Sequence, residues 1–117
     1  MELWQLDATE LARLIRVGQA SSREAVSACL ARMDAANGKL NAVVRRMDEE
    51  ALAAADAADA ARAHGDALGP LHGVPVTIKV NTDQKDHPTD NGVVAFRDLI
   101  APDDAPVVGA VSLEPRC

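Results

Sequence analysis

The sequence of 117 residues has few aromatic side chains, with one Trp, one Phe and no Tyr. Its hydrophobic content is 48%, but much of this is alanine, which contributes little buried area per residue. Trp4 and Phe96 are therefore the only large aromatic side chains available to a core. A chain of this length forms one domain at most, and we expect the core that it builds alone to be thin.

Positive charge is also in deficit, because 12 Lys and Arg residues face 18 Asp and Glu residues, giving a net charge of −6. Nucleic-acid binding depends on a basic patch that displaces counterions, so this balance argues against a nucleic-acid partner. The apolar runs are too short and too interrupted to span a bilayer. The N-terminal stretch does not have the charged and apolar regions of a signal peptide. We therefore expect neither nucleic acid nor membrane as a partner.

Cysteine is scarce, and Cys29 and Cys117 do not form a disulfide framework. No second Cys or His lies at a metal-ligand spacing from either of them, so the sequence predicts no metal site. Cys29 falls on the apolar face of a predicted helix, where a buried, unreactive thiol is expected. This cysteine usage fits a reducing, cytoplasmic location.

Helices are predicted from capping residues in the first 65 residues. Asp7 and Ser21 are expected N-caps, and each is followed three residues later by a glutamate, Glu10 or Glu24, as in a capping box. Gly18 is expected to end the first of these helices.

The second helix has the clearest amphipathic pattern and is expected to end at Asn37-Gly38. Its apolar residues follow at helical spacing: Val26, Cys29, Leu30 and Met33. A third helix, rich in alanine, is predicted from about Asp48 to His64, with Gly65 ending it. A solvated helix and a packed helix are both compatible with this composition, and we favour the packed one. The acidic residues expected to face solvent are Glu49, Glu50, Asp56 and Asp59.

Two short strands are predicted, over residues 40–44 and over Val76–Ile78. The second follows a turn rich in Gly and Pro and ends at Lys79. Lysine is almost never fully buried without a partner. Lys79 therefore either extends into water, as most lysines at strand ends do, or is held there for chemistry.

The segment Gly69-Pro-Leu-His-Gly-Val-Pro-Val-Thr-Ile-Lys79 resembles the amidase signature family, which carries the pattern G-P-L-x-G-x-P-[VI]-x-[IV]-K. The resemblance extends over about residues 6–108. It implies an α/β fold, here incomplete, of N-terminal helices and the first strands of a mixed sheet. The chain would then be a partial amidase domain with a helical region 1–65, a turn-strand-lysine motif 69–80 and a loop-rich tail 81–117.

The resemblance also implies a chemistry. Such enzymes hydrolyse a carboxamide to an acid and ammonia through an acyl-enzyme, without a cofactor, and Lys79 matches the base of their Ser–Ser–Lys triad. The two serines and the oxyanion hole of the family come from a Ser/Gly-rich segment downstream of the lysine. In this sequence the only serine after Lys79 is Ser112, which has no such neighbourhood. We therefore expect an amidase-type hydrolase truncated before the serines and inactive in this form.

Two departures from the family pattern accompany this expectation. Val80 follows the lysine where the family has Asp, and the match ends near Gly109. A shifted reading frame and an internal stop would both produce such an end. His72 and His87 invite an acid–base role, but a structural histidine and a solvated loop histidine, respectively, are favoured.

Three interpretations stay open at this point. A second chain, perhaps a full-length relative, supplies the serines, and the completed site takes a small amide as substrate. Alternatively, the chain is a small non-catalytic helical interaction module that binds a partner through Val26 and Leu30. In the third, it is a non-functional gene fragment whose unpaired strands expose apolar surface.

Overall fold

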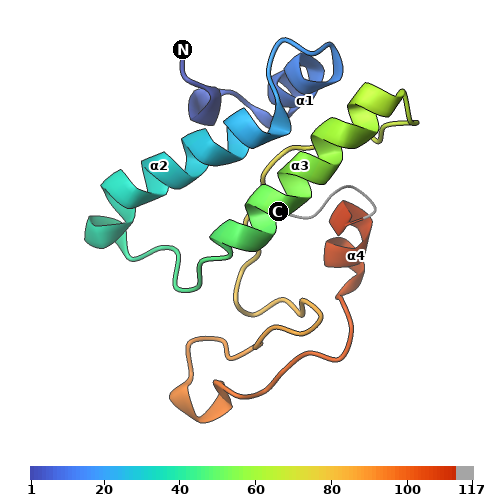
Figure 1. Cartoon of the computed structure of the whole chain (residues 1–117). Coiled ribbons are helices and arrows are strands. Elements are labelled where there is room, and N and C mark those ends of the chain that lie inside the picture. The colour runs from blue at the N-terminus through green and yellow to red at the C-terminus, as the bar shows by residue number, and fades with distance from the viewer. Residues whose placement is uncertain (113–117) are drawn as a thin grey trace. The chain divides into compact units, whose positions relative to one another are not determined.

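The computed structural model describes residues 1–112, which fall into two compact units, Met1–Val76 and residues 77–112. Each unit is described by itself. The predictions for residues 113–117, including the break before Pro115 and the chain end at Cys117, lie outside the described residues. The elements in chain order (Figure 1) are η1 (Leu3–Gln5), α1 (Ala8–Arg16), α2 (Ser22–Leu40), α3 (Asp48–His64), η2 (Val94–Phe96) and α4 (Pro106–Ser112), where η marks a 3-10 helix.

The two predicted N-caps are confirmed. The Asp7 carboxylate accepts a hydrogen bond from the Glu10 amide at 2.8 Å, and the Ser21 hydroxyl accepts one from the Glu24 amide at 3.0 Å. Glu24 completes its capping box by accepting from the Ser21 amide at 2.8 Å. The box expected at α1 is not completed, because the Glu10 carboxylate accepts from Arg13 instead. This hydrogen bond lowers the pKa of Glu10.

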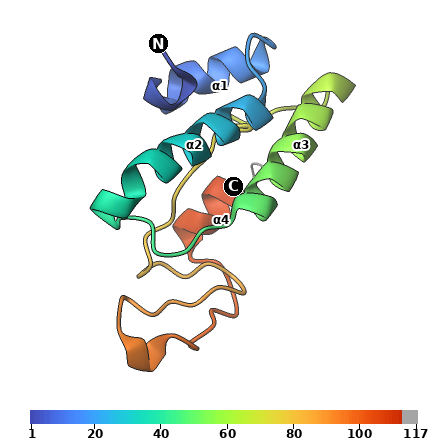
Figure 2. The same cartoon turned by 60° about the vertical axis from the view of Figure 1, so that its left-hand side comes forward.

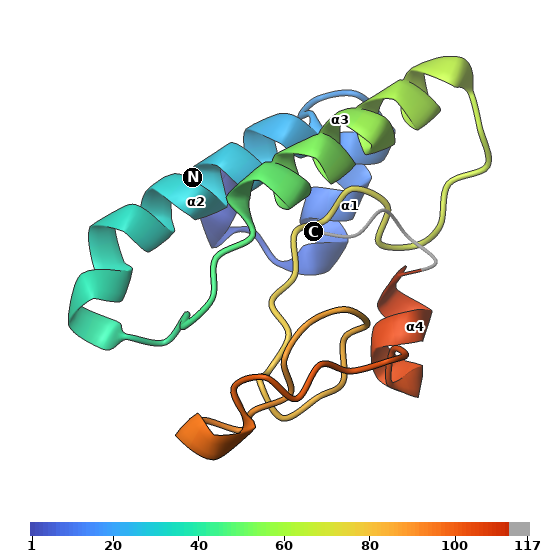
Figure 3. The ribbon, with the colours of Figure 1, turned by 60° about the horizontal axis from the view of Figure 1, so that its bottom comes forward.

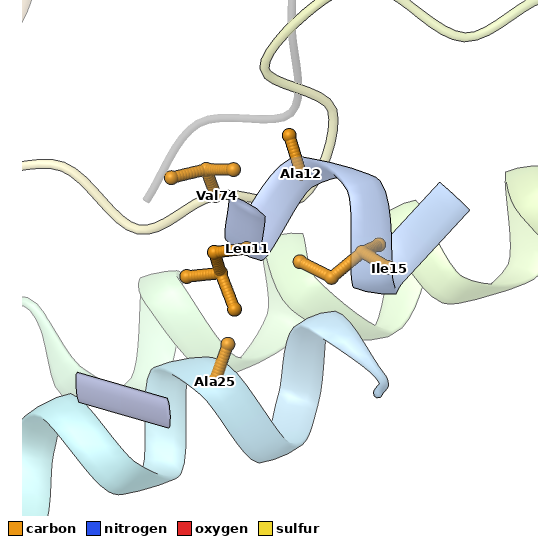
Figure 4. Packing of buried hydrophobic residues seen from close by; sticks show 5 residues of the cluster. All are labelled: Leu11, Ala12, Ile15, Ala25 and Val74. Carbon is orange, nitrogen blue, oxygen red and sulfur yellow. The ribbon is translucent and has the colours of Figure 1, made fainter. Parts of the chain in front are cut away.

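The first core cluster lies where α1 meets α2 and the segment that follows α3. Leu11, Ala12 and Ile15 of α1 pack with Ala25 of α2 and with Val74 (Figure 4). Partly buried leucines pack against this cluster: Leu3, Leu6 and Leu71. The position of Leu6 just before the cap of α1 fits the hydrophobic staple that the sequence predicts.

A second cluster joins α2 to α3, which lie side by side and run in opposite directions (Figure 2). Val26 of α2 packs with Ala51 and Ala55 of α3, and Leu30 and Leu52 lie at the edge of the contact. The small side chains of α3 let the two backbones approach closely, so the packed interpretation of this helix is confirmed. The apolar face of α2 is thus covered by α3 and is not open to a partner.

The strand predicted over residues 40–44 does not form. Helix α2 continues past Gly38 to Leu40, and Asn41 ends it in the left-handed conformation with φ 50°. The Asn37 side chain then donates to the Val43 carbonyl and accepts from the Val43 amide, both at 2.9 Å. These bonds occupy the backbone groups that a strand would offer to a neighbour.

Residues 77–112 form a loop in which the chain returns beside itself (Figure 3). One antiparallel bridge pairs Pro88 with Ile100, and it is the only β-pairing among the described residues. Residues 76–78 have no strand partner there, so the predicted mixed sheet is not formed by residues 1–112. Helix α4 begins at Pro106, and the expected cap Asp104 instead accepts from the Lys85 amide at 2.7 Å.

The environment of Cys29 gives a test of the packing of α2. Burial raises the pKa of the free Cys29 thiol, so less thiolate is present near neutral pH in the folded chain than in the unfolded one. In a Cys117→Ser variant, we expect Cys29 to react with a chromogenic aromatic disulfide several times more slowly in buffer than in concentrated urea, at about pH 8. Equal rates in the two solvents would show that this part of α2 is not packed as described.

Candidate functional site

The motif begins with a tight turn that follows α3. The His72 amide donates to the Gly69 carbonyl at 3.4 Å, and the Val74 amide donates to the Leu71 carbonyl at 3.0 Å. Gly73, between them, has φ +76°, in the left-handed region that side chains other than glycine adopt at a cost. The punctuation seen in the sequence therefore does form a turn, and it delivers Val74 to the first core cluster.

Gly73 also lies against α1 and α2, where there is no room for a side chain. A Cβ atom at this position would lie 3.0 Å from both Cβ and Oγ of Ser22 and 3.3 Å from Cγ2 of Ile15. Ser22 is fully buried, and its hydroxyl donates to the Gly73 carbonyl at 2.6 Å. The motif is thus fixed to the first turn of α2 by a short hydrogen bond and a close backbone approach.

The same turn of α2 is held from the other side by α3. The Asp59 carboxylate accepts from the Ser22 amide at 2.7 Å and from the Arg23 amide at 3.1 Å. First-turn amides have no partner inside their own helix, and a negative charge at this end also suits the helix dipole. Asp56 adds an ion pair with Arg23 at 2.6 Å. The expectation that Asp56 and Asp59 simply face solvent was therefore wrong, because both bind α2.

His72 is buried inside this arrangement. Its Nε2 lies 2.8 Å from the Ala58 carbonyl oxygen of α3. A carbonyl oxygen can only accept, so Nε2 carries the proton and donates. This geometry suits the structural histidine that the sequence analysis favours, and it adds another link between the motif and α3.

Lys79 belongs to the unit of residues 77–112, where its side chain is exposed. Its carbonyl oxygen accepts from the Thr82 amide at 2.9 Å, so a turn begins directly after it. Within that unit no side chain makes a hydrogen bond or ion pair with the Lys79 ammonium. Val80, in place of the expected carboxylate, is half-buried.

The described serines are committed elsewhere or lie in helices. The Ser21 and Ser22 hydroxyls are used in the hydrogen bonds at the start of α2, and Ser27 is an exposed residue in the middle of that helix. Ser112 is the last described residue of α4. The described residues therefore supply a candidate base, and no serine in a glycine-rich loop accompanies it.

Other kinds of site find little support among residues 1–112. No group of three His, Cys, Asp or Glu side chains there is placed to hold a metal ion. Of the helices in that range, none combines the length and the apolar content that crossing a membrane requires.

Comparison with known proteins identifies the arrangement. The family model described as Amidase matches residues 24–113. The chain belongs to the amidase family. It is 55% identical over 106 residues to the indoleacetamide hydrolase of Bradyrhizobium diazoefficiens, covering 91% of this chain and 20% of that protein.

Two further amidase relatives show how widely this segment occurs. One component of the glutamyl-tRNA(Gln) amidotransferase of Moorella thermoacetica is 42% identical, over 92% of this chain and 22% of its own. The crystal structure of a bacterial aryl acylamidase, one of the amidase signature enzymes, matches with a TM-score of 0.87 and 26% identity, over 95% of this chain and 24% of that chain. The chain thus spans about a fifth of the length of the curated relatives it matches.

The close approach at Gly73 predicts a specific sensitivity of this amidase segment. Gly73→Ala should destabilise the chain by about 2–4 kcal/mol, from the left-handed conformation and the contact with Ser22 together. Gly38→Ala is the matched control, since a Cβ atom there meets nothing within 4 Å inside α2, and it should stabilise by about 0.5–1 kcal/mol. Urea melts followed by far-UV circular dichroism measure both. A Gly73→Ala variant as stable as the wild type would contradict the packing of the motif on α2.

Proposed function

We propose that this chain provides the N-terminal helices and the general base, Lys79, of an amidase-type hydrolase that converts a carboxamide to a carboxylic acid and ammonia. The observation that carries the proposal is the motif Gly69–Lys79, in a chain that belongs to the amidase family and ends that motif with an exposed lysine. The exposed side chain is free to reach groups supplied by other parts of an amidase domain. The proposed fold of the complete domain is α/β, with strands that pair with residues 76–78.

The chemistry assigns Lys79 a proton-transfer role. Its neutral amine takes a proton, through a relaying serine, from a second serine, whose oxygen attacks the amide carbonyl carbon. The tetrahedral intermediate is stabilised by backbone amides, and the C–N bond breaks as the proton passes to the leaving nitrogen, releasing ammonia. Water then attacks the acyl-enzyme, and the acid leaves. Both serines of this Ser–Ser–Lys triad come from sequence outside residues 1–112, so we propose that those residues alone are inactive.

The substrate in this proposal is a small carboxamide. Indoleacetamide is the first compound to test, because the relative that is 55% identical over 106 residues carries the name indoleacetamide hydrolase. The serines come from the remaining part of an amidase domain, either on the same polypeptide or on an associating relative. The free Cys29 thiol fits the reducing cytoplasm as the location.

The alternative of a helical interaction module loses its basis in the packing. Val26 is 1% exposed, and Leu30 packs against the cluster formed by Val26, Ala51 and Ala55. The face through which such a module was expected to bind is therefore occupied by α3.

A chimera tests the proposal for Lys79. The matched residues of the Bradyrhizobium indoleacetamide hydrolase are replaced by the corresponding residues of this chain, and ammonia release from indoleacetamide is measured. We expect an active chimera, in which Lys79→Ala reduces kcat by at least about 100-fold. Lys85→Ala, which removes an exposed lysine from the same unit, should leave kcat within about twofold. An inactive chimera, or full activity in Lys79→Ala, would contradict the proposed function.

A further inference from the structure

The loop of residues 77–112 exposes large apolar side chains at its tip. We call these residues the tip face: Val93 (43% exposed), Val94 (75%), Phe96 (51%), Leu99 (57%) and Ile100 (51%). All lie within eight residues of sequence, around the 3-10 helix η2. Phe96, which the composition suggests as an aromatic anchor of the core, is therefore at the surface. Apolar side chains gathered in this way usually mark an interaction site.

The tip is held open by backbone hydrogen bonds at its base. The Thr89 amide donates to the Leu99 carbonyl at 3.0 Å, the Ala101 amide donates to the His87 carbonyl at 3.0 Å, and the Asp86 amide donates to the Ala101 carbonyl at 2.9 Å. These bonds pair the two sides of the loop (Figure 3).

The turn beyond that base is closed in the same way. The Val93 amide donates to the Asp90 carbonyl at 2.8 Å, and the Leu99 amide donates to the Phe96 carbonyl at 2.9 Å. Asn91 and Gly92 both have positive φ, 51° and 77°, which reverses the chain. The tip face is thus presented by an ordered backbone, and covering it would not require the loop to refold.

We propose that the tip face is the surface on which the remaining polypeptide of an amidase domain packs. The proposal rests on the proposed function, because it takes the missing serines to arrive with that polypeptide. The aryl acylamidase structure contains a segment of the same fold over 95% of this chain, and about three-quarters of its own chain lies outside the match. A complete amidase therefore has ample chain to cover an apolar face that residues 1–112 leave open. The occupant is accordingly a largely apolar surface of that remaining part.

A second copy of the chain fits the tip face less well. Residues 77–112 carry six aspartates and three basic residues, so two copies meeting through this loop would bring like charges together. The same excess of negative charge opposes an anionic lipid surface.

Binding between separate pieces tests the tip face. The part of the Bradyrhizobium hydrolase outside the matched residues is immobilised, and binding of the 117-residue chain is measured by biolayer interferometry. We expect Phe96→Asp and Leu99→Asp each to weaken binding at least about tenfold. Val17→Asp is the matched control, because Val17 is 55% exposed in the other unit, and it should change binding less than about twofold. Far-UV circular dichroism checks that all variants keep their helices.

A labelling experiment keeps the proposal testable if the separate hydrolase piece does not fold. Val94→Cys should react readily with a maleimide in the 117-residue chain and at least about tenfold more slowly in the chimera, where the tip face is covered. Val17→Cys should react at similar rates in both, with mass spectrometry assigning each modified peptide.

The outcomes separate the two proposals. Equal labelling of Val94→Cys in the chain and in an active chimera would overturn the tip-face proposal and leave the proposed function intact. An inactive chimera in which Val94→Cys is protected would support the tip face and contradict the function. A dimer of the 117-residue chain that Phe96→Asp dissociates would show a self-interface and would also overturn the proposal.

Discussion

The contact between Gly73 and Ser22 is the constraint on which the arrangement of residues 1–76 depends. A serine with no exposed surface donates its hydroxyl to the Gly73 carbonyl, and the missing side chain of Gly73 makes the 2.6 Å hydrogen bond possible. Because Ser22 is also the first residue of α2, the motif is anchored to a helix terminus. Asp59 of α3 closes the same turn from the opposite side. One buried residue thus connects the motif with both long helices.

This arrangement divides the motif into two functional parts. The residues from Gly69 to Val74 form a structural joint, in which the Gly69 carbonyl accepts from Arg16 at 2.9 Å and His72 contacts α3. Lys79 carries the proposed chemistry and lies beyond the joint, in the second unit. The glycines and the histidine of the motif therefore have a packing role that is independent of catalysis. A chain can keep this joint intact whether or not serines complete the site.

Local features of the sequence predicted the local features of the structure well. The caps at Asp7 and Ser21 and the bounds of α3 were predicted correctly, because they depend on residues within one or two turns. The hydrogen bonds from Ser22 to Asp59 and to Gly73 join residues 37 and 51 positions apart, and no periodicity reveals such partners. The strand over residues 40–44 failed for a related reason, since its apolar pattern ignores the Asn37 amide that binds Val43.

The candidate site could be predicted only in part. Lys79 was found through the resemblance of its motif to a family, and its exposed position agrees with the sequence expectation that strand-end lysines extend into water. The tip face was not predicted, because Phe96 was expected to anchor a core and its neighbours were assigned no surface role. Short apolar runs give no signal of whether the chain that would cover them is present.

Hydrogen exchange at the first turn of α2 tests the central claim, that the motif and α3 together hold this helix terminus. First-turn amides normally exchange fast, because they have no partner within the helix. The account predicts strong protection of the Ser22 and Arg23 amides, which Asp59 accepts, and much weaker protection of Ala8 and Thr9 at the start of α1. Exchange of Ser22 and Arg23 as fast as that of Ala8 and Thr9 would contradict it.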